Sequence, residues 1–346
     1  GIDNMKDYIK YCKELERKTS ALFGLDLKLE LEKIARSLFI APKKYAMWKY
    51  KISKTKVDNQ WIEGPGYGEL YDLSHKDAYL LRGLLLARRD NCQFQRDLYK
   101  QVLDNLMLKK PMQETFDLII RHCLKLLNGE IPMHDLIIIK SLGSNYKDEN
   151  FHMKIFGEHL RSIGRPAVPG ARLEYVIVNS RDKAEKLGPK MRAPETYLER
   201  MESDEPEPID YIYYLEHVLM NGIEQLFQVG YAEELDKIQK EQTYNKLVCV
   251  LHDIIEKGHQ DVVTSVWNST NGDLEKTIQL LTSEESPIRN QAIKSRRLYY
   301  GAHDLFHPKF VTRPIDQLSR CYQNGYLQHY IQSRCSPEMY QELYRD

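Results

Sequence analysis

Hydrophobic and charged residues alternate near the N-terminal end of the chain, which is the pattern of a half-buried strand. Leu27, Leu29 and Leu31 alternate with charged residues. A period of two places successive side chains on opposite faces of a strand. The pattern therefore predicts a strand here, with Glu30 and Glu32 sharing one face.

A second alternating stretch covers residues 44–49, directly after Lys43. Two such strands would form a hairpin that brings the carboxylates close to Lys43, Lys44 and Tyr45. An amphipathic hairpin with a solvated charged face explains the same pattern, because charged residues protect exposed strands from aggregation. Both interpretations stay open from the pattern alone.

Longer stretches have apolar residues at every third or fourth position, which predicts amphipathic helices. The predicted helices cover residues 3–23, 94–106, 112–127 and 152–163. Helix-stopping residues separate or end them, as at Lys109–Pro111 and Asn128–Gly129. A Pro/Gly-rich turn at 165–170 precedes a predicted buried strand.

The C-terminal third is predicted to form short helices. Three of them cover 247–257, 261–268 and 273–282, with joints at Gly258-His259 and Asn271–Asp273. This spacing is faintly similar to ubiquitin-associated domains, although Lys257–His259 stands where those domains have a hydrophobic loop. A small packing bundle is the competing interpretation of this region.

Charge and cysteine content narrow the choice of function. Among 346 residues, Lys plus Arg and Asp plus Glu total 50 each, so a nucleic-acid surface would require local clustering of cations. The six cysteines contain no CxxC pair, which argues against zinc and favours reduced thiols inside a cell.

No run of 18 apolar residues is present, so we expect no membrane span. The chain begins with Gly1 near a helical pattern, as a segment of a longer protein or a cleaved tag would.

The N-terminal hairpin carries a recognisable motif. Residues 29–47 resemble the element L-E-(aromatic)-E-K…L-L-I-x-K-K-R-Y-A-G of family B DNA polymerases, which closes the palm domain before the thumb. The sequence departs from that element at Pro42, Lys44 and Met47. Proline removes one backbone donor, and one cation is lost with it.

Further motifs of the same family follow in order along the chain. Residues 82–91 resemble K-G-x-x-x-x-R-R-D-x, and residues 135–147 resemble a thumb sequence. Residues 165–178 resemble G-R-P-P-x-P-G-D-R, with Ala171 in place of the family Asp, and 209–216 resemble I-D-x-x-Y-Y-L-E, which opens a long thumb helix. The resemblance covers residues 1–228. The tail does not match the zinc-binding tail of the eukaryotic replicative enzymes. Together with Pro42, this makes the chain resemble the polymerases of large DNA viruses, of the asfarvirus type, more than the eukaryotic enzymes.

The resemblance implies an α+β fold, in which the end of an antiparallel-sheet palm is followed by a mostly helical thumb and a helical extension. The implied domains are 1–83 (palm), 84–228 (thumb) and 229–346 (extension). The DNA contacts that it implies are Lys43, Lys44, Tyr45, Arg82, Gly83, Arg88, Arg89, Lys140, Lys147 and Arg172. A structural role is the alternative for Arg88 and Arg89, in which one pairs with an acid and the other points to solvent.

The implied activity is DNA-directed DNA polymerisation by two-metal nucleotidyl transfer with Mg²⁺. The aspartate motifs that supply the main metal ligands in that family are absent from this sequence, so this segment alone is expected to be inactive. Glu30 or Glu32 would be an accessory carboxylate. The implied partners are primer–template DNA, deoxynucleoside triphosphates and a processivity or replication factor, in the host cytoplasm or nucleus if the protein is viral.

A function from a different class also fits parts of the sequence. The chain has no net charge and lacks the catalytic aspartates, as a non-enzymatic helical scaffold would. Its ubiquitin-associated-like tail would then recruit a protein partner.

Overall fold

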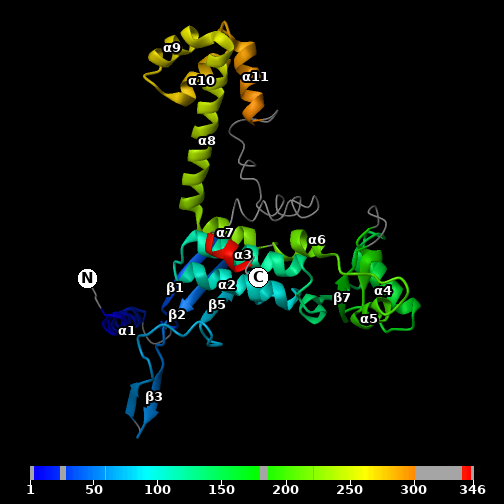
Figure 1. The fold of residues 1–346 in the computed structure, drawn as a ribbon. Coiled ribbons are helices and arrows are strands. Elements are labelled where there is room, and N and C mark those ends of the chain that lie inside the picture. Colours follow the sequence, from blue (N-terminus) through cyan, green and yellow to red (C-terminus); the bar gives the residue numbers. More distant parts are fainter. Residues whose placement is uncertain are drawn as a thin grey trace. The chain divides into compact units, whose positions relative to one another are not determined.

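The computed structural model of the chain describes residues 4–23, 29–58, 60–179, 186–220, 222–300 and 337–343. These residues form two compact units. Unit 1 holds the described residues up to Gly230 together with 337–343, and unit 2 begins at Tyr231. Unit 1 combines helices with small antiparallel sheets, and unit 2 is helical (Figure 1). The predicted α+β fold class is confirmed.

The chain begins with helix α1 (Met5–Leu22), close to the predicted bounds. The prediction of a strand after α1 is wrong for residues 29–34, which form no strand. Leu27, which belonged to the same prediction, lies outside the described residues. Two backbone amides of this stretch bond to side chains of α1 instead of to a neighbouring strand. Leu29 N–H donates to Ser20 Oγ at 3.0 Å, and Leu31 N–H donates to Glu16 Oε2 at 3.1 Å.

The first sheet has the antiparallel strand order β1–β2–β5. Its strands are β1 (Ala35–Ala41), β2 (Lys44–Lys49) and β5 (Tyr79–Arg82). The alternating pattern at 44–49 is therefore confirmed as a strand, and its Ala46 and Trp48 are buried. Pro42 and Lys43 form the two-residue turn between β1 and β2, and Lys43 has a φ of 63°. Proline followed by a positive φ is typical of a type II turn.

A separate two-stranded ribbon connects β2 to β5. It consists of β3 (Lys54–Val57) and β4 (Gln60–Glu63). The Gly/Pro cluster at 64–68 follows it as turns, with Gly66 and Gly68 at positive φ.

Helices and a second sheet make up the rest of unit 1. Helices α2 (Gln93–Met107) and α3 (Met112–Leu127) pack against each other and bury Leu98, Leu103 and Leu126. The second sheet has the order β6–β7–β8. The remaining elements of this part are η1 (Leu85–Ala87), η2 (Met133–Leu136), β6 (Ile138–Ser141), α4 (His152–Ser162), β7 (Arg172–Ile177), η3 (Gly188–Lys190), β8 (Met191–Arg192), α5 (Pro194–Met201) and α14 (Pro337–Leu343).

The long helix expected to open at residues 209–216 is interrupted, so this expectation was wrong. Helix α6 (Tyr211–Tyr213) continues into the π-helix η4 (Tyr214–Leu219), and a new helix, α7 (Ile223–Gly230), follows. Gly222 precedes α7 with a φ of 90°, a conformation that favours glycine and ends the helical path.

Unit 2 contains the short helices that the sequence predicts for residues 247–282. They belong to α8 (Ala232–Ile254) with the π-helical turn η5 (Ile255–His259), to α9 (Gln260–Ser269) and to α10 (Leu274–Thr282). Gly258 and Gly272 have positive φ at the two predicted joints. A further helix, α11 (Arg289–Tyr300), packs on α8, so that α9, α10 and α11 gather at the C-terminal end of α8 (Figure 1).

The second unit has a hydrophobic core of its own. It is built from residues of all four helices, and its members are Leu247, Val250, Leu251, Ile254, Val263, Leu274, Ile278, Leu281, Ile288 and Ala292. Across the part of the chain that the structure describes, no helix has the length and apolar character needed to cross a membrane.

Candidate nucleic-acid interface

Five of the predicted DNA-binding residues meet at one end of the first sheet, a group that we call the turn cluster (Lys43, Lys44, Tyr45, Arg82 and Gly83). The antiparallel pairing of β2 with β5 places Tyr45 opposite Arg82. Gly83 follows directly and has a φ of 62°. A Cβ atom at Gly83 would lie 2.4 Å from the carbonyl oxygen of Lys43. Only glycine allows the backbone after β5 to approach the β1–β2 turn this closely.

The cations of the turn cluster are accessible. Lys43, Lys44 and Arg82 are exposed. Lys44 Nζ donates to Gln225 Oε1 of α7 at 3.4 Å, so α7 lies beside this end of the sheet. Among the described residues, neither Lys43 nor Arg82 has an ion-pair partner. Two full positive charges are therefore available to an anion at this place.

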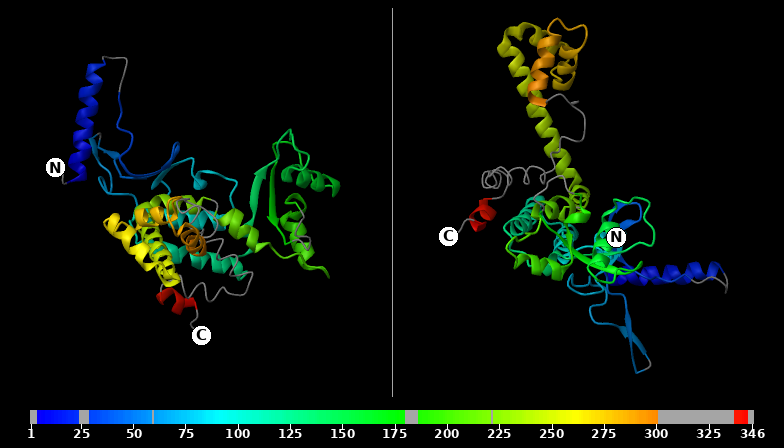
Figure 2. Two further views of the ribbon diagram at one scale, coloured as in Figure 1. Left: turned by 90° about the horizontal axis from the view of Figure 1, so that it is seen from above. Right: turned by 90° about the vertical axis from the view of Figure 1, so that its right-hand side faces the viewer.

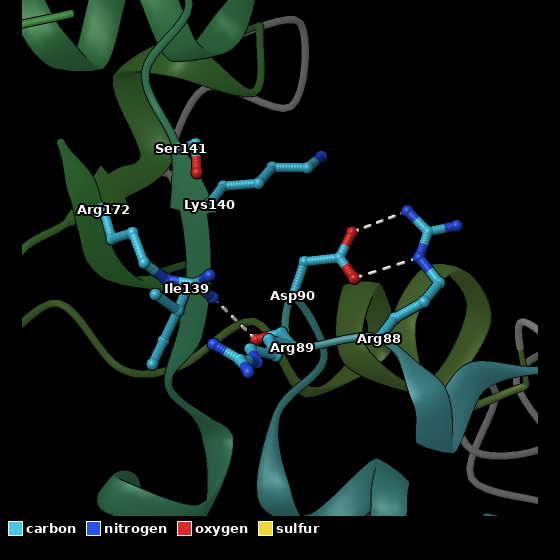
Figure 3. Close-up of a pocket in the computed structure, with 7 residues that line it drawn as sticks. All are labelled: Arg88, Arg89, Asp90, Ile139, Lys140, Ser141 and Arg172. Atoms are coloured by element: carbon cyan, nitrogen blue, oxygen red, sulfur yellow. Dashed lines mark hydrogen bonds and ion pairs between the residues drawn. The ribbon is translucent and has the colours of Figure 1, made fainter. Parts of the chain in front are cut away.

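Four more predicted residues line a single pocket of about 450 Å³, which we call the arginine pocket (Figure 3). They come from three separate segments of the chain. The lining residues are Arg88, Arg89, Asp90, Ile139, Lys140, Ser141 and Arg172. Four cationic side chains thus surround one carboxylate, which leaves an excess of positive charge.

Local structure explains how these segments meet. Arg88 and Arg89 lie in the loop between η1 and α2, and Lys140 lies in β6. Arg172 opens β7, and the β6–β7 register places it opposite Ser141. An Arg172 Nη atom donates to the backbone oxygen of Arg89 at 3.1 Å, which joins the loop to the sheet.

Asp90 holds Arg88 in a two-point ion pair. Arg88 Nε and Nη2 donate to the two carboxylate oxygens of Asp90 at 3.1 and 2.7 Å. Partial burial is the largest single influence on Asp90 and raises its pKa, but the hydrogen bonds and charge of Arg88, a backbone hydrogen bond and the charge of Lys140 together outweigh it, so the pKa of Asp90 lies below its usual range. The hydrogen bonds to Asp90 raise the pKa of Arg88. The planar guanidinium is therefore fixed in direction at the pocket.

Lys140 lines the pocket as a cation outside the Arg88–Asp90 pair. Its side chain extends from β6 on the side of the Arg88–Asp90 pair and does not join it (Figure 3). Its charge also acts on the neighbouring His152, whose pKa is lowered first by burial and then by Lys140. Within the described residues Lys140 has no ion-pair partner. Fixed guanidinium groups next to an unpaired ammonium are suited to binding phosphate oxygens.

The remaining predicted residues lie outside both groups. Lys147 is exposed between β6 and α4 and does not line the arginine pocket. Glu30 and Glu32 are exposed, and Glu32 pairs with the adjacent Lys33 at 2.9 Å. Across the described ranges, no group of three or more His, Cys, Asp or Glu residues could hold a metal ion.

Sequence reasoning missed three residues that shape the two groups. Asp90 directly follows the two arginines, and an acid two positions after Arg88 is a signal that could have identified it. Ser141 carried a weaker signal, since it adjoins Lys140. Gln225 is 181 residues away from Lys44 in sequence, so no local pattern could have revealed that contact.

Comparison with known proteins identifies the family. The family model for DNA polymerase family B matches residues 1–229. The chain belongs to DNA polymerase family B. Its turn cluster and arginine pocket both lie within the matched residues.

The relatives are polymerases of viruses and eukaryotes. A DNA polymerase of Paramecium bursaria Chlorella virus NY2A is 26% identical over 231 residues, which are 66% of this chain and 22% of that protein. One of Pyramimonas orientalis virus is 28% identical over 52% of this chain and 15% of that protein. The DNA polymerase delta catalytic subunit of Plasmodium falciparum is 25% identical over 66% of this chain and 19% of that protein. The chain thus spans about a fifth or less of the length of these relatives.

A solved structure is also similar to this chain. The family B DNA polymerase of Pyrobaculum calidifontis matches with a TM-score of 0.40 and 16% identity, over 62% of this chain and 24% of that one.

Proposed function

We propose that this chain binds primer–template duplex DNA as part of a DNA-directed DNA polymerase that acts in replication. The observation that carries the proposal is the arginine pocket, where cations from three segments of a family B chain converge. The ion pair with Asp90 accounts for the position of Arg88, but it does not account for Lys140, which lies beside that pair without an ion-pair partner among the described residues. A backbone phosphate supplies the anion that such a site lacks.

The turn cluster supplies a second set of phosphate contacts in this proposal. Contacts to phosphates position a duplex without reading its sequence, as a polymerase requires, because it must accept every sequence. Each phosphate neutralised by a cation releases counterions from DNA, so binding weakens as salt rises. The proposed interface therefore predicts sequence-independent, strongly salt-dependent binding.

We assign the chemical step to the whole polymerase of which this chain is proposed to be a part. Nucleotidyl transfer by polymerases uses two metal ions held by carboxylates, and the described residues do not provide such a site. We therefore derive no catalytic step from this chain. Mg²⁺, deoxynucleoside triphosphates and a processivity or replication factor belong to the proposal for the whole polymerase, as does a location inside the host cell. An accessory role for Glu30 or Glu32 stays a prediction.

The turn cluster gives the direct test. In the double variant Lys43→Ala/Lys44→Ala, the log–log salt slope of duplex binding should become shallower by up to about 1.8, at about 0.9 per phosphate contact. Fluorescence anisotropy of a labelled primer–template measures it. The control Lys10→Ala/Lys125→Ala removes the same charge from exposed positions on α1 and α3. Equal slopes in both variants would contradict the assignment.

Unit 2 supports a second candidate function. Its separate core and its helical spacing fit an independent interaction module that recruits a protein partner, as the similarity to ubiquitin-associated domains implies. Titration of the chain with ubiquitin, followed by NMR, tests one such partner. Shifts restricted to residues of unit 2 would favour this candidate, and an unchanged spectrum would remove ubiquitin from consideration.

A further inference from the structure

The β3–β4 ribbon stands apart from the sheet that it connects. It extends as a separate finger (Figures 1 and 2). All four residues of β3 are exposed, and the ribbon pairs with no other strand among the described residues. Isolated two-stranded hairpins are marginally stable in water. A partner that lies against such a finger would therefore add to its stability.

The register of the ribbon separates its side chains onto two faces. Lys54 pairs with Glu63, and Thr55 pairs with Ile62. Because side chains alternate along a strand, Lys54 and Lys56 share one face. Val57 and Ile62, which are 45% and 47% exposed, share the other.

The acidic residue on the ribbon's strands is already neutralised. Glu63 forms an ion pair with Lys6 of α1 at 3.2 Å. At the same end, Gly64 N–H donates to the carbonyl oxygen of Ser53 at 3.2 Å and closes the base of the finger. In the described part of the chain, neither Lys54 nor Lys56 has an ion-pair partner. Asp58, in the turn at the tip, is the remaining acid of the finger.

We propose that the basic face of this ribbon lies along the backbone of duplex DNA, with Lys54 and Lys56 on successive phosphates of one strand. Residues two apart in a strand are separated by about 6.8 Å, twice a rise of about 3.4 Å. This distance is comparable to the separation of successive phosphates along a DNA strand. A two-stranded ribbon is also narrow enough to enter the major groove.

The inference rests on the proposed function and extends it to an element outside the two groups described above. Charge complementarity favours DNA as the occupant, because the two lysines are unpaired and the nearby Glu63 is engaged by Lys6. The alternative occupant is a protein bound to the face of Val57 and Ile62. That face offers two apolar side chains, which is a small area for a stable protein contact.

The test replaces the lysines without weakening the strand. Threonine favours strands, so Lys54→Thr/Lys56→Thr keeps the ribbon and removes its charge. The matched control Val57→Thr/Ile62→Thr changes the opposite face of the same finger, and Lys54→Arg/Lys56→Arg keeps the charge. Duplex binding is measured by anisotropy as a function of salt for each variant.

We expect the salt slope to become shallower by about 1.8 in Lys54→Thr/Lys56→Thr, and to stay at the wild-type value in the control and in the arginine variant. A wild-type slope in the lysine variant, together with a shallower slope in Lys43→Ala/Lys44→Ala, would overturn the ribbon contact and retain the proposed function. Wild-type slopes in both lysine variants would overturn both.

Discussion

Gly83 determines how closely the end of β5 approaches the β1–β2 turn. The position combines a φ of 62° with a backbone oxygen, that of Lys43, 2.4 Å from where a Cβ would stand. Both features exclude larger residues. The turn cluster therefore depends on one residue that carries no charge.

Replacement of this glycine tests that dependence. Gly83→Ala should lower the free energy of unfolding by more than Gly164→Ala does. Gly164 has a φ of 78° and no atom within 4 Å of its Cβ position, so it incurs only the left-handed backbone cost of about 1–2 kcal/mol. The contact at Gly83 should add about 1–3 kcal/mol. Equal losses of unfolding free energy in the two variants, measured by urea unfolding, would contradict this, because they would mean that the β1–β2 turn shifts without cost to make room for the Cβ atom.

At the residue scale, the sequence predicted which cations form the arginine pocket better than it predicted which acid each of them pairs with. Arg88, Arg89, Lys140 and Arg172 were all named from motifs, and the fold brings them together. The sequence allowed one of the two arginines to pair with an acid, but it did not identify Asp90 as the partner of Arg88. Motifs identify residue types in order along the chain, whereas the partner of a charge depends on side-chain geometry.

Among the elements of unit 1, β8 is held to the segment before α6 by an ion pair. Arg192 donates from Nε and Nη2 to the carboxylate of Glu207 at 2.7 and 2.9 Å. The hydrogen bonds from Arg192 outweigh burial and hold the pKa of Glu207 below its ordinary value of 4.5. The pair therefore links protonation to the stability of this sheet.

The sign of that linkage gives a pH-dependent prediction. A carboxyl with a lowered folded pKa stabilises the fold above its unfolded pKa, and this contribution disappears as pH falls through the folded pKa. Glu207→Gln should cost roughly 1–2 kcal/mol at pH 7. The difference from wild type should shrink below about pH 4, as measured by urea unfolding. A constant difference, or an equal effect of Glu202→Gln at an exposed position outside the pair, would contradict this account.

Elements with local periodicity were predicted well, and those that need a distant partner were not. Helices α1, α2 and α3 follow from apolar spacing and their stop signals, which lie within each segment. The strand expected around Leu29 and Leu31 failed because its amides bond to Ser20 and Glu16 of α1. Alternation indicates two faces but does not show that a neighbouring strand exists.

For the whole molecule, the division into two units predicts that they can be destabilised separately. Ile278 lies in the core of unit 2 and is 2% exposed. Ile278→Ala should cost about 2–5 kcal/mol and should speed hydrogen exchange in α9 and α10, with α2 and α3 unchanged. Gln279→Ala, exposed on the same helix, should stay within about 0.5 kcal/mol of wild type. Faster exchange in α2 or α3 would mean that the two cores are not independent.

The central claim is that this family B chain binds duplex DNA through phosphate contacts. Its most direct test is a salt titration of the unaltered chain, by fluorescence anisotropy, on two primer–templates of unrelated sequence. We predict equal affinities for the two duplexes and a log–log slope of about −0.9 for each phosphate contact. Binding that is insensitive to salt, or that prefers one sequence, would contradict the claim.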